Sequence, residues 1–191
     1  IFDVAFLDTV PGMTVLCPSS FAELRAMLTD AIQVLPGPVA VRYPRGGEGD
    51  YKGNSSAAGS VVLREGNKIT LVGYGMLINQ VLRCADLLEQ SGISAEVVKL
   101  NTITPIDYSS VFVSLKKTGR LLVAEDVVDP GCVGQRLAAA AVQAGIPVSG
   151  VMLCNLGRDF VTHGSVSQLQ KLCGLDSESL YRKALEVCSH G

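Results

Sequence analysis

Residues 69–100 read ITLVGYGMLINQVLRCADLLEQSGISAEVVKL and contain a complete strand, helix and strand. Residues 69–73 and 95–100 are apolar runs of strand length. Between them, residues 76–91 have a helical apolar repeat that is stopped by Gly92. The stripe of this helix consists of Leu77, Val81, Cys84 and Leu88. This alternation is typical of a doubly wound α/β domain.

The same alternation continues on both sides of this segment. We predict further strands at 59–64, 120–124 and 148–154, and the later runs are continuously apolar, as in strands that are covered on both faces. Predicted helices fall between and after these strands, at 107–117 with Asp107 as cap, 134–144, 165–172 and 177–187. The expected fold class is therefore α/β, a three-layer α/β/α domain over residues 58–191 with a mostly parallel five-stranded sheet.

Residues 1–46 contain a separate strand, helix and strand. An apolar run at 13–17 ends at Pro18, after which Ser19 or Ser20 can cap a helix through about Gln33. A second strand is predicted at 38–43. The expected buried face of the helix consists of Phe21, Leu24, Leu28 and Ile32. One βαβ unit is too small for a stable parallel sheet, so we expect the remnant of a domain whose beginning is absent.

Residues 47–57 separate the two predicted domains. The sequence around them, GGEGDYKGNSS at 46–56, is rich in glycine and small polar residues, which favour irregular backbone. We expect this segment to bury nothing and to act as a linker.

Composition excludes several classes of function. The chain of 191 residues is 48% hydrophobic and 18% charged, with no apolar run near the roughly 20 residues of a membrane span. Its 16 basic and 18 acidic residues nearly cancel, so nucleic acid is a poor candidate partner. The six cysteines form no C-x-x-C pair and are predicted to be reduced thiols rather than metal ligands. We expect a cytoplasmic protein without a membrane anchor.

Two arginines follow the strand predicted at 38–43, in VRYPRG at 41–46. Ligands collect at the carboxyl edge of parallel sheets, and a guanidinium grips phosphate through two parallel hydrogen bonds. Arg42 and Arg45 are therefore candidates for a phosphate clamp. Alternatively, both pair with acidic residues at a domain boundary.

Two further candidates carry weaker signals. Glu125 and Asp126 precede Gly131 and Gly134, a pattern that allows an anion or dinucleotide site, although a structural turn is favoured because the full glycine fingerprint is missing. His163 has a suitable pKa for proton transfer, but no triad surrounds it in the sequence. We expect it to have a structural or interface role.

Several motifs resemble the transketolase group of thiamine-diphosphate enzymes, and especially the 1-deoxyxylulose-5-phosphate synthases. FDxxFL (2–7), PGM (11–13), PS (18–19) and GPxAVRYPRG (37–46) are similar to the end of a pyrimidine-binding domain. LREG (63–66), GYG (73–75), PID (105–107), KTGR (117–120) and Glu125 are similar to the C-terminal domain of the whole superfamily. DFxxHGS (159–165) and GLD (174–176) resemble the synthases again.

The resemblance implies an enzyme that condenses pyruvate with glyceraldehyde 3-phosphate on thiamine diphosphate and magnesium. It assigns the phosphate of the substrate to Arg45, and it implies that Arg42 holds the domain boundary together. The resemblance also implies a homodimer and an N-terminal remainder that carries the cofactor motifs, none of which occurs in this chain. We therefore expect the chain alone to be inactive and to bind no cofactor or metal.

Some positions depart from the synthase pattern. Asp8 and Asn101 stand where basic residues are common in that family, and Glu125-Asp126 replaces a pair of glutamates. The C-terminal section of a split transketolase, or a non-catalytic dimerisation or interaction module, therefore stays open as an alternative.

Overall fold

The main sheet of the computed structural model has five strands in the order β3-β5-β4-β7-β8. The structure describes residues 1–56 and 59–189. Only β3 runs antiparallel to its neighbour, so the predicted, mostly parallel sheet is confirmed. The strands are β3 (Ser60–Arg64), β4 (Ile69–Tyr74), β5 (Ala95–Leu100), β7 (Arg120–Ala124) and β8 (Gly150–Cys154).

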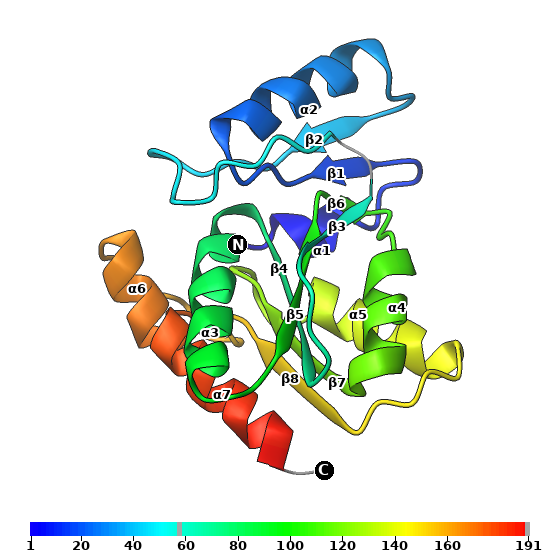
Figure 1. The fold of residues 1–191 in the computed structure, drawn as a ribbon. Helices are drawn as coiled ribbons and strands as arrows, with labels where there is room; N and C mark the ends of the chain where they lie inside the picture. Colours follow the sequence, from blue (N-terminus) through cyan, green and yellow to red (C-terminus); the bar gives the residue numbers. More distant parts are fainter. Residues whose placement is uncertain (57–58, 190–191) are drawn as a thin grey trace.

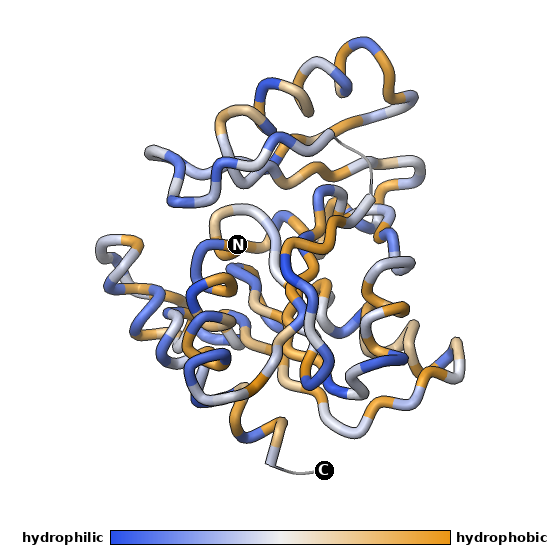
Figure 2. The backbone as a smooth tube through the Cα atoms, in the orientation of Figure 1, coloured by the Kyte–Doolittle hydropathy of each residue, from blue (hydrophilic) through white to orange (hydrophobic). Residues whose placement is uncertain are grey.

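Helices cover both faces of this sheet (Figure 1), which confirms the three-layer architecture. On one face pack α3 (Ile78–Gln90) and α7 (Ser177–Ser189), and on the other pack α4 (Ser109–Thr118) and α5 (Val133–Gln143). The central strands β4, β5 and β7 are almost wholly buried because apolar helix faces lie above and below them. Figure 2 shows apolar residues concentrated along these strands.

Short elements connect or extend this framework. The 3₁₀ helix η1 (Gly75–Leu77) leads from β4 into α3, and α6 (Val166–Leu172) precedes α7. Helix α4 begins at Ser109 with Tyr108 at its cap position, one residue later than the predicted cap at Asp107. Asp107 still contributes, since its carboxylate accepts a hydrogen bond from the backbone N–H of Ser109.

A second, smaller sheet lies beyond the carboxyl edge of the main sheet (Figure 1). Strands β1 (Thr14–Leu16) and β2 (Val39–Val41) pair directly in parallel and are connected by α2 (Phe21–Gln33), as the βαβ pattern predicts. The third strand, β6 (Thr102–Thr104), pairs antiparallel with β1 and comes directly after β5. Strand β6 was not predicted, because three residues are too few to show a period.

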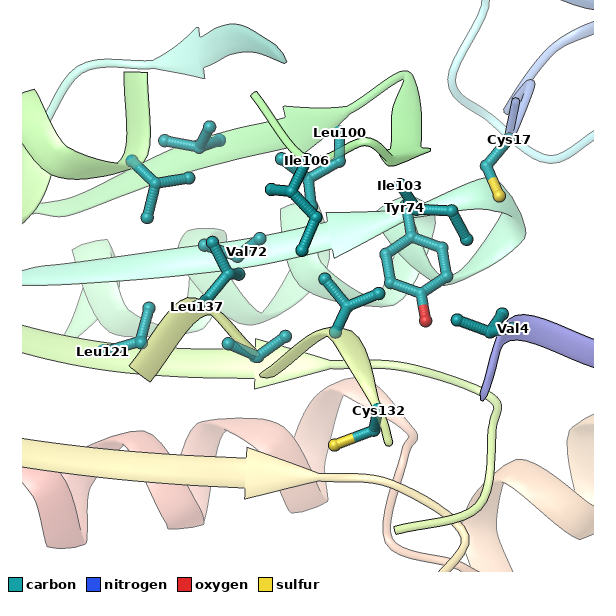
Figure 3. Packing of buried hydrophobic residues seen from close by; sticks show 14 of the residues in the cluster. Val4, Cys17, Val72, Tyr74, Leu100, Ile103, Ile106, Leu121, Cys132 and Leu137 are labelled. Atoms are coloured by element: carbon teal, nitrogen blue, oxygen red, sulfur yellow. The ribbon is translucent and has the colours of Figure 1, made fainter. Parts of the chain in front are cut away.

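The two sheets share one hydrophobic core. Val4 from α1 (Asp3–Leu7) and Cys17 after β1 pack in the same cluster as Tyr74 and Leu100 of the main sheet. Figure 3 shows the Tyr74 ring close to Val4, Cys17 and Ile103. The packing is therefore continuous across the predicted domain boundary, and the last residue of the predicted linker lies outside the described residues.

The predicted buried face of α2 is wrong. Phe21 is 57% exposed, Leu28 40% and Ile32 81%, whereas Glu23 and Met27 are fully buried. Met27 packs with Leu16 beneath the helix. The helix is rotated in this way because Glu23 reaches a buried lysine in the main sheet, and an ionised side chain must keep its partner when it leaves water.

All six cysteines are free, and four of them are buried. Burial raises the pKa of the Cys17 and Cys84 thiols to about 12. Within residues 1–56 and 59–189, no helix is both long and apolar enough to cross a membrane. Nor does any group of three or more His, Cys, Asp or Glu side chains in these ranges form a metal site.

Candidate functional site at the carboxyl edge

Three strand ends meet where the two sheets adjoin. Arg42 follows β2, Gly75 follows β4, and Glu125 follows β7. A cavity of about 290 Å³ at this point is lined by residues from all three segments. A neighbouring cavity of about 570 Å³ lies between the 44–50 loop, α3 and α6. This edge is where an α/β sheet normally binds its ligands.

Arg42 forms ion pairs with two carboxylates. Its Nε lies 2.7 Å from Asp3 Oδ2, and its Nη1 lies 2.8 Å from Asp126 Oδ1. Although burial opposes the charge, Asp126 and Asp3 raise the pKa of Arg42 further above its ordinary value. The side chain therefore joins β2 to α1 and to the loop after β7, and its hydrogen-bonding capacity is largely used.

Arg45 is placed differently. Its side chain is exposed and lines the 570 Å³ cavity, together with Met76, Arg83 and Gln170. Within the described part of the chain, no hydrogen bond or ion pair holds its guanidinium. Arg83 already has a partner, since its Nη2 lies 2.6 Å from Asp50 Oδ2. Of the two arginines that line this cavity, Arg45 is therefore the one whose guanidinium can bind an anion.

Residues 46–56, which we call the strap, connect Arg45 to β3. Glu48 Oε2 accepts a hydrogen bond of 2.7 Å from the Phe21 N–H at the start of α2. The Tyr51 N–H donates one of 2.9 Å to Asn79 Oδ1 in α3. A Cβ at Gly49 would lie 2.5 Å from the Asn79 side chain, so a larger residue at this position would displace the side chain that accepts from Tyr51.

The expectation that this segment buries nothing is therefore wrong. Its backbone is irregular, as predicted for a linker, but Tyr51 is half-buried and packs against the core beneath α3. Ser20 Oγ donates to the carbonyl oxygen of Gly53, and Asn101 Nδ2 donates to that of Ser56 at 3.0 Å. These contacts hold the strap against both α2 and the main sheet.

A fully buried ion pair lies beneath the strap. Lys99 Nζ in β5 is 3.0 Å from Glu23 Oε2 in α2, and both side chains have 0% exposure. Burial opposes the ionisation of Glu23, but the hydrogen bond from Ser55 and the charge of Lys99 outweigh it and lower the pKa of Glu23. Burial also lowers the pKa of Lys99, and Glu23 opposes that shift.

Sequence reasoning missed Glu23, Lys99 and Tyr51. Two signals were present, the spacing Ser20-x-x-Glu23 of a capping box and a lysine inside the apolar run AEVVKL. Ser20 Oγ does accept a hydrogen bond of 3.1 Å from the Glu23 N–H. Neither signal, however, indicates that these two residues, 76 positions apart, lie in contact.

Glu125 occupies the helix terminus that was considered as an anion site. Its oxygens accept hydrogen bonds of 2.9 Å from the N–H groups of Val133 and Gly134, at the start of α5. Tyr74 Oη donates a third, of 2.8 Å. Burial raises the pKa of Glu125, although these hydrogen bonds oppose the shift. An external anion would have to displace this carboxylate.

His163 lies apart from these groups. It is exposed in the loop between β8 and α6, just before the capping box that Ser165 forms with Gln168. The residues lining the two cavities at this edge do not include it.

Two family models match the chain in order. The model of the transketolase pyrimidine binding domain matches residues 1–47, and that of the transketolase C-terminal domain matches residues 59–180.

Curated relatives agree with these matches. 1-Deoxy-D-xylulose-5-phosphate synthases from Gloeobacter violaceus and Chlorobaculum tepidum are 32% and 33% identical to the chain, and the matches cover 99% and 97% of it. Each match covers 30% of the relative, so the chain spans less than a third of their length.

Solved structures agree as well. A split-gene transketolase, described as an inactive β4 tetramer, superposes with a TM-score of 0.80 at 25% identity, over 98% of this chain and 61% of that one. A Pichia stipitis transketolase superposes with a TM-score of 0.72 at 18% identity, over 99% and 27%, which supports the fold alone. The predicted resemblance is confirmed, and the chain belongs to the transketolase family.

Proposed function

We propose that this chain forms the C-terminal section of a thiamine-diphosphate-dependent carboligase of the 1-deoxyxylulose-5-phosphate synthase type. The enzyme would join pyruvate to glyceraldehyde 3-phosphate and release carbon dioxide, giving a precursor of isoprenoids, thiamine and pyridoxal. The observation that carries the proposal is the match of nearly the whole chain to such synthases at 32–33% identity.

Arg45 is the residue of this chain that we assign to the substrate. It stands exposed at the carboxyl edge of β2, beside a cavity of about 570 Å³. A guanidinium in this position can hold the phosphate of glyceraldehyde 3-phosphate through two parallel hydrogen bonds. Arg42 would instead keep β2 in place, because Asp3 and Asp126 already occupy its donors.

The described residues do not fit thiamine diphosphate and magnesium by themselves. The buried carboxylate of Glu23 is paired with Lys99, and that of Glu125 caps α5. A magnesium ion bound with a diphosphate needs carboxylate or amide oxygens grouped around it, and no such acidic cluster occurs within the described ranges. In our proposal, the N-terminal remainder of the enzyme supplies the cofactor site, and the whole enzyme is a homodimer.

Reconstitution tests the proposal. The chain is co-expressed with a truncated Gloeobacter violaceus synthase that consists of its N-terminal part, without the segment that matches this chain. We expect formation of 1-deoxyxylulose 5-phosphate from pyruvate and glyceraldehyde 3-phosphate by the pair. For the isolated chain, we expect no turnover and no calorimetric binding of thiamine diphosphate with magnesium. Turnover or cofactor binding by the isolated chain, or a stable but inactive pair, would contradict the proposal.

A split transketolase is the second candidate function. The superposition on a split-gene transketolase, with a TM-score of 0.80 over 98% of the chain, favours it. The same reconstituted pair should then transfer a two-carbon ketol unit from a ketose phosphate to an aldose phosphate, without releasing carbon dioxide. Measuring both reactions on one preparation separates the two candidates.

A further inference from the structure

We propose that the buried Glu23–Lys99 pair, acting through the strap, is a positioning device for Arg45. The inference rests on the proposed role of Arg45 in binding the substrate phosphate. Neither Glu23 nor Lys99 lines the 570 Å³ cavity, and Tyr51 of the strap does not line it either, so their effect on a ligand there must pass through the backbone.

The two oxygens of the Glu23 carboxylate have different hydrogen-bonding partners. Oε2 accepts from the Ser19 N–H at 2.8 Å and pairs with Lys99, so it joins the start of α2 to β5. Oε1 accepts from Tyr51 Oη at 2.9 Å and from Ser55 Oγ, both of which belong to the strap. The strap bonds can therefore be removed without breaking the ion pair.

The Lys99 side chain supports the strap in a second way. Its Nζ lies 5.7 Å from the centroid of the Tyr51 ring, within the range of a cation–π contact. Tyr51 is thus held at its hydroxyl by Glu23, at its ring by Lys99 and at its backbone by Asn79. Three contacts from three different elements leave this residue little freedom to move.

Arg45 lies between two anchored points. Three residues before it, Arg42 is bound to Asp3 and Asp126. Three residues after it, Glu48 accepts the hydrogen bond from the N–H of Phe21. The Asp50–Arg83 pair and the Glu48–Phe21 hydrogen bond are both exposed and add less than a buried contact, so Tyr51 is the main anchor on the strap side. If the contacts of Tyr51 are lost, the glycines at 46, 47 and 49 can adopt other conformations, and Arg45 moves with them.

Kinetics of the reconstituted enzyme test the inference. The variant Tyr51→Phe/Ser55→Ala removes the hydroxyls that bind Glu23 Oε1. We expect the KM for glyceraldehyde 3-phosphate to rise about tenfold, with kcat and the KM for pyruvate unchanged. With unphosphorylated glyceraldehyde as acceptor, we expect no change. Tyr181→Phe is the matched control, since it removes a tyrosine hydroxyl that bonds Ser91 on the far side of the domain.

Arg45→Ala, measured in parallel, separates the two proposals. If it leaves the KM for glyceraldehyde 3-phosphate unchanged, the assignment of Arg45 is wrong. If it raises that KM while the strap variant does not, only the positioning inference is overturned. Equal losses with phosphorylated and unphosphorylated acceptors in the strap variant would indicate a general folding defect and would also overturn it.

Hydrogen exchange on the 191-residue chain gives a readout that is independent of activity. In Tyr51→Phe/Ser55→Ala, we expect faster exchange of the amides in residues 46–56 and unchanged exchange in β4 and β5. Unchanged exchange in the strap would contradict the inference, because the hydrogen bonds from Tyr51 and Ser55 to Glu23 would then not restrain it.

Discussion

At the scale of single residues, the buried charge of Lys99 bears directly on stability. Its partner Glu23 is equally buried, so Lys99→Met leaves a carboxylate without a counterion in the interior. We expect a loss of about 3–5 kcal/mol in the free energy of unfolding, measured by urea denaturation. Adding Glu23→Gln to this variant should restore much of the loss, because the buried charge is then gone.

A surface pair provides the control for this prediction. Lys52 Nζ lies 2.6 Å from Glu48 Oε1, but the lysine side chain is 60% exposed. Lys52→Met should therefore cost less than about 1 kcal/mol. Equal effects of Lys52→Met and Lys99→Met would show that the buried pair is no more important than an exposed one.

At the scale of elements, Asp107 ties the start of a strand to the start of a helix. Its Oδ2 accepts from the Ser60 N–H of β3 at 3.1 Å, and its Oδ1 accepts from the Ser109 N–H of α4 at 3.0 Å. Burial opposes ionisation, but the hydrogen bonds from Ser109 and Ser60 outweigh it and lower the pKa of Asp107 below its ordinary value of 3.8.

The lowered pKa sets the sign of a pH dependence. The ionised carboxylate stabilises the folded state above the unfolded pKa, and this stabilisation is lost as the pH falls through the folded pKa. Asp107→Asn should therefore destabilise the chain by about 1 kcal/mol at pH 7, and the difference from wild type should shrink below about pH 4. Urea denaturation at several pH values measures this. A stability difference that is constant with pH would contradict this prediction. The control is Asp86→Asn, because Asp86 forms an exposed ion pair with Arg64.

At the scale of the whole molecule, the outer face of α2 predicts self-association. Phe21, Leu28 and Ile32 are exposed on one helix, and large exposed apolar patches are uncommon on monomers. We expect light scattering to show concentration-dependent assembly of the chain, and Leu28→Glu/Ile32→Glu to shift it toward monomer.

The control for association lies on another helix. Val113 in α4 is 67% exposed, and Val113→Glu should leave the assembly unchanged. A wild-type chain that stays monomeric over a wide concentration range would contradict the prediction.

The sequence by itself determined the main sheet, the βαβ unit and the free thiols. Apolar runs at period two or in continuous blocks predict strands, and apolar stripes at period 3.6 predict helices, because burial of one face is a local property of the pattern. It also placed Arg42 and Arg45 at a strand end, since the carboxyl edge of a parallel sheet follows from chain direction alone.

Only the tertiary structure decided which face of α2 is buried, that the strap is anchored, and that Arg42 is paired while Arg45 is open. Each of these outcomes depends on contacts between residues far apart in the chain, such as Glu23 with Lys99 and Arg42 with Asp126. Local spacing carries no information about such pairs. A buried charge, however, must meet its counterion, and this requirement overrides the apolar stripe of the helix that carries it.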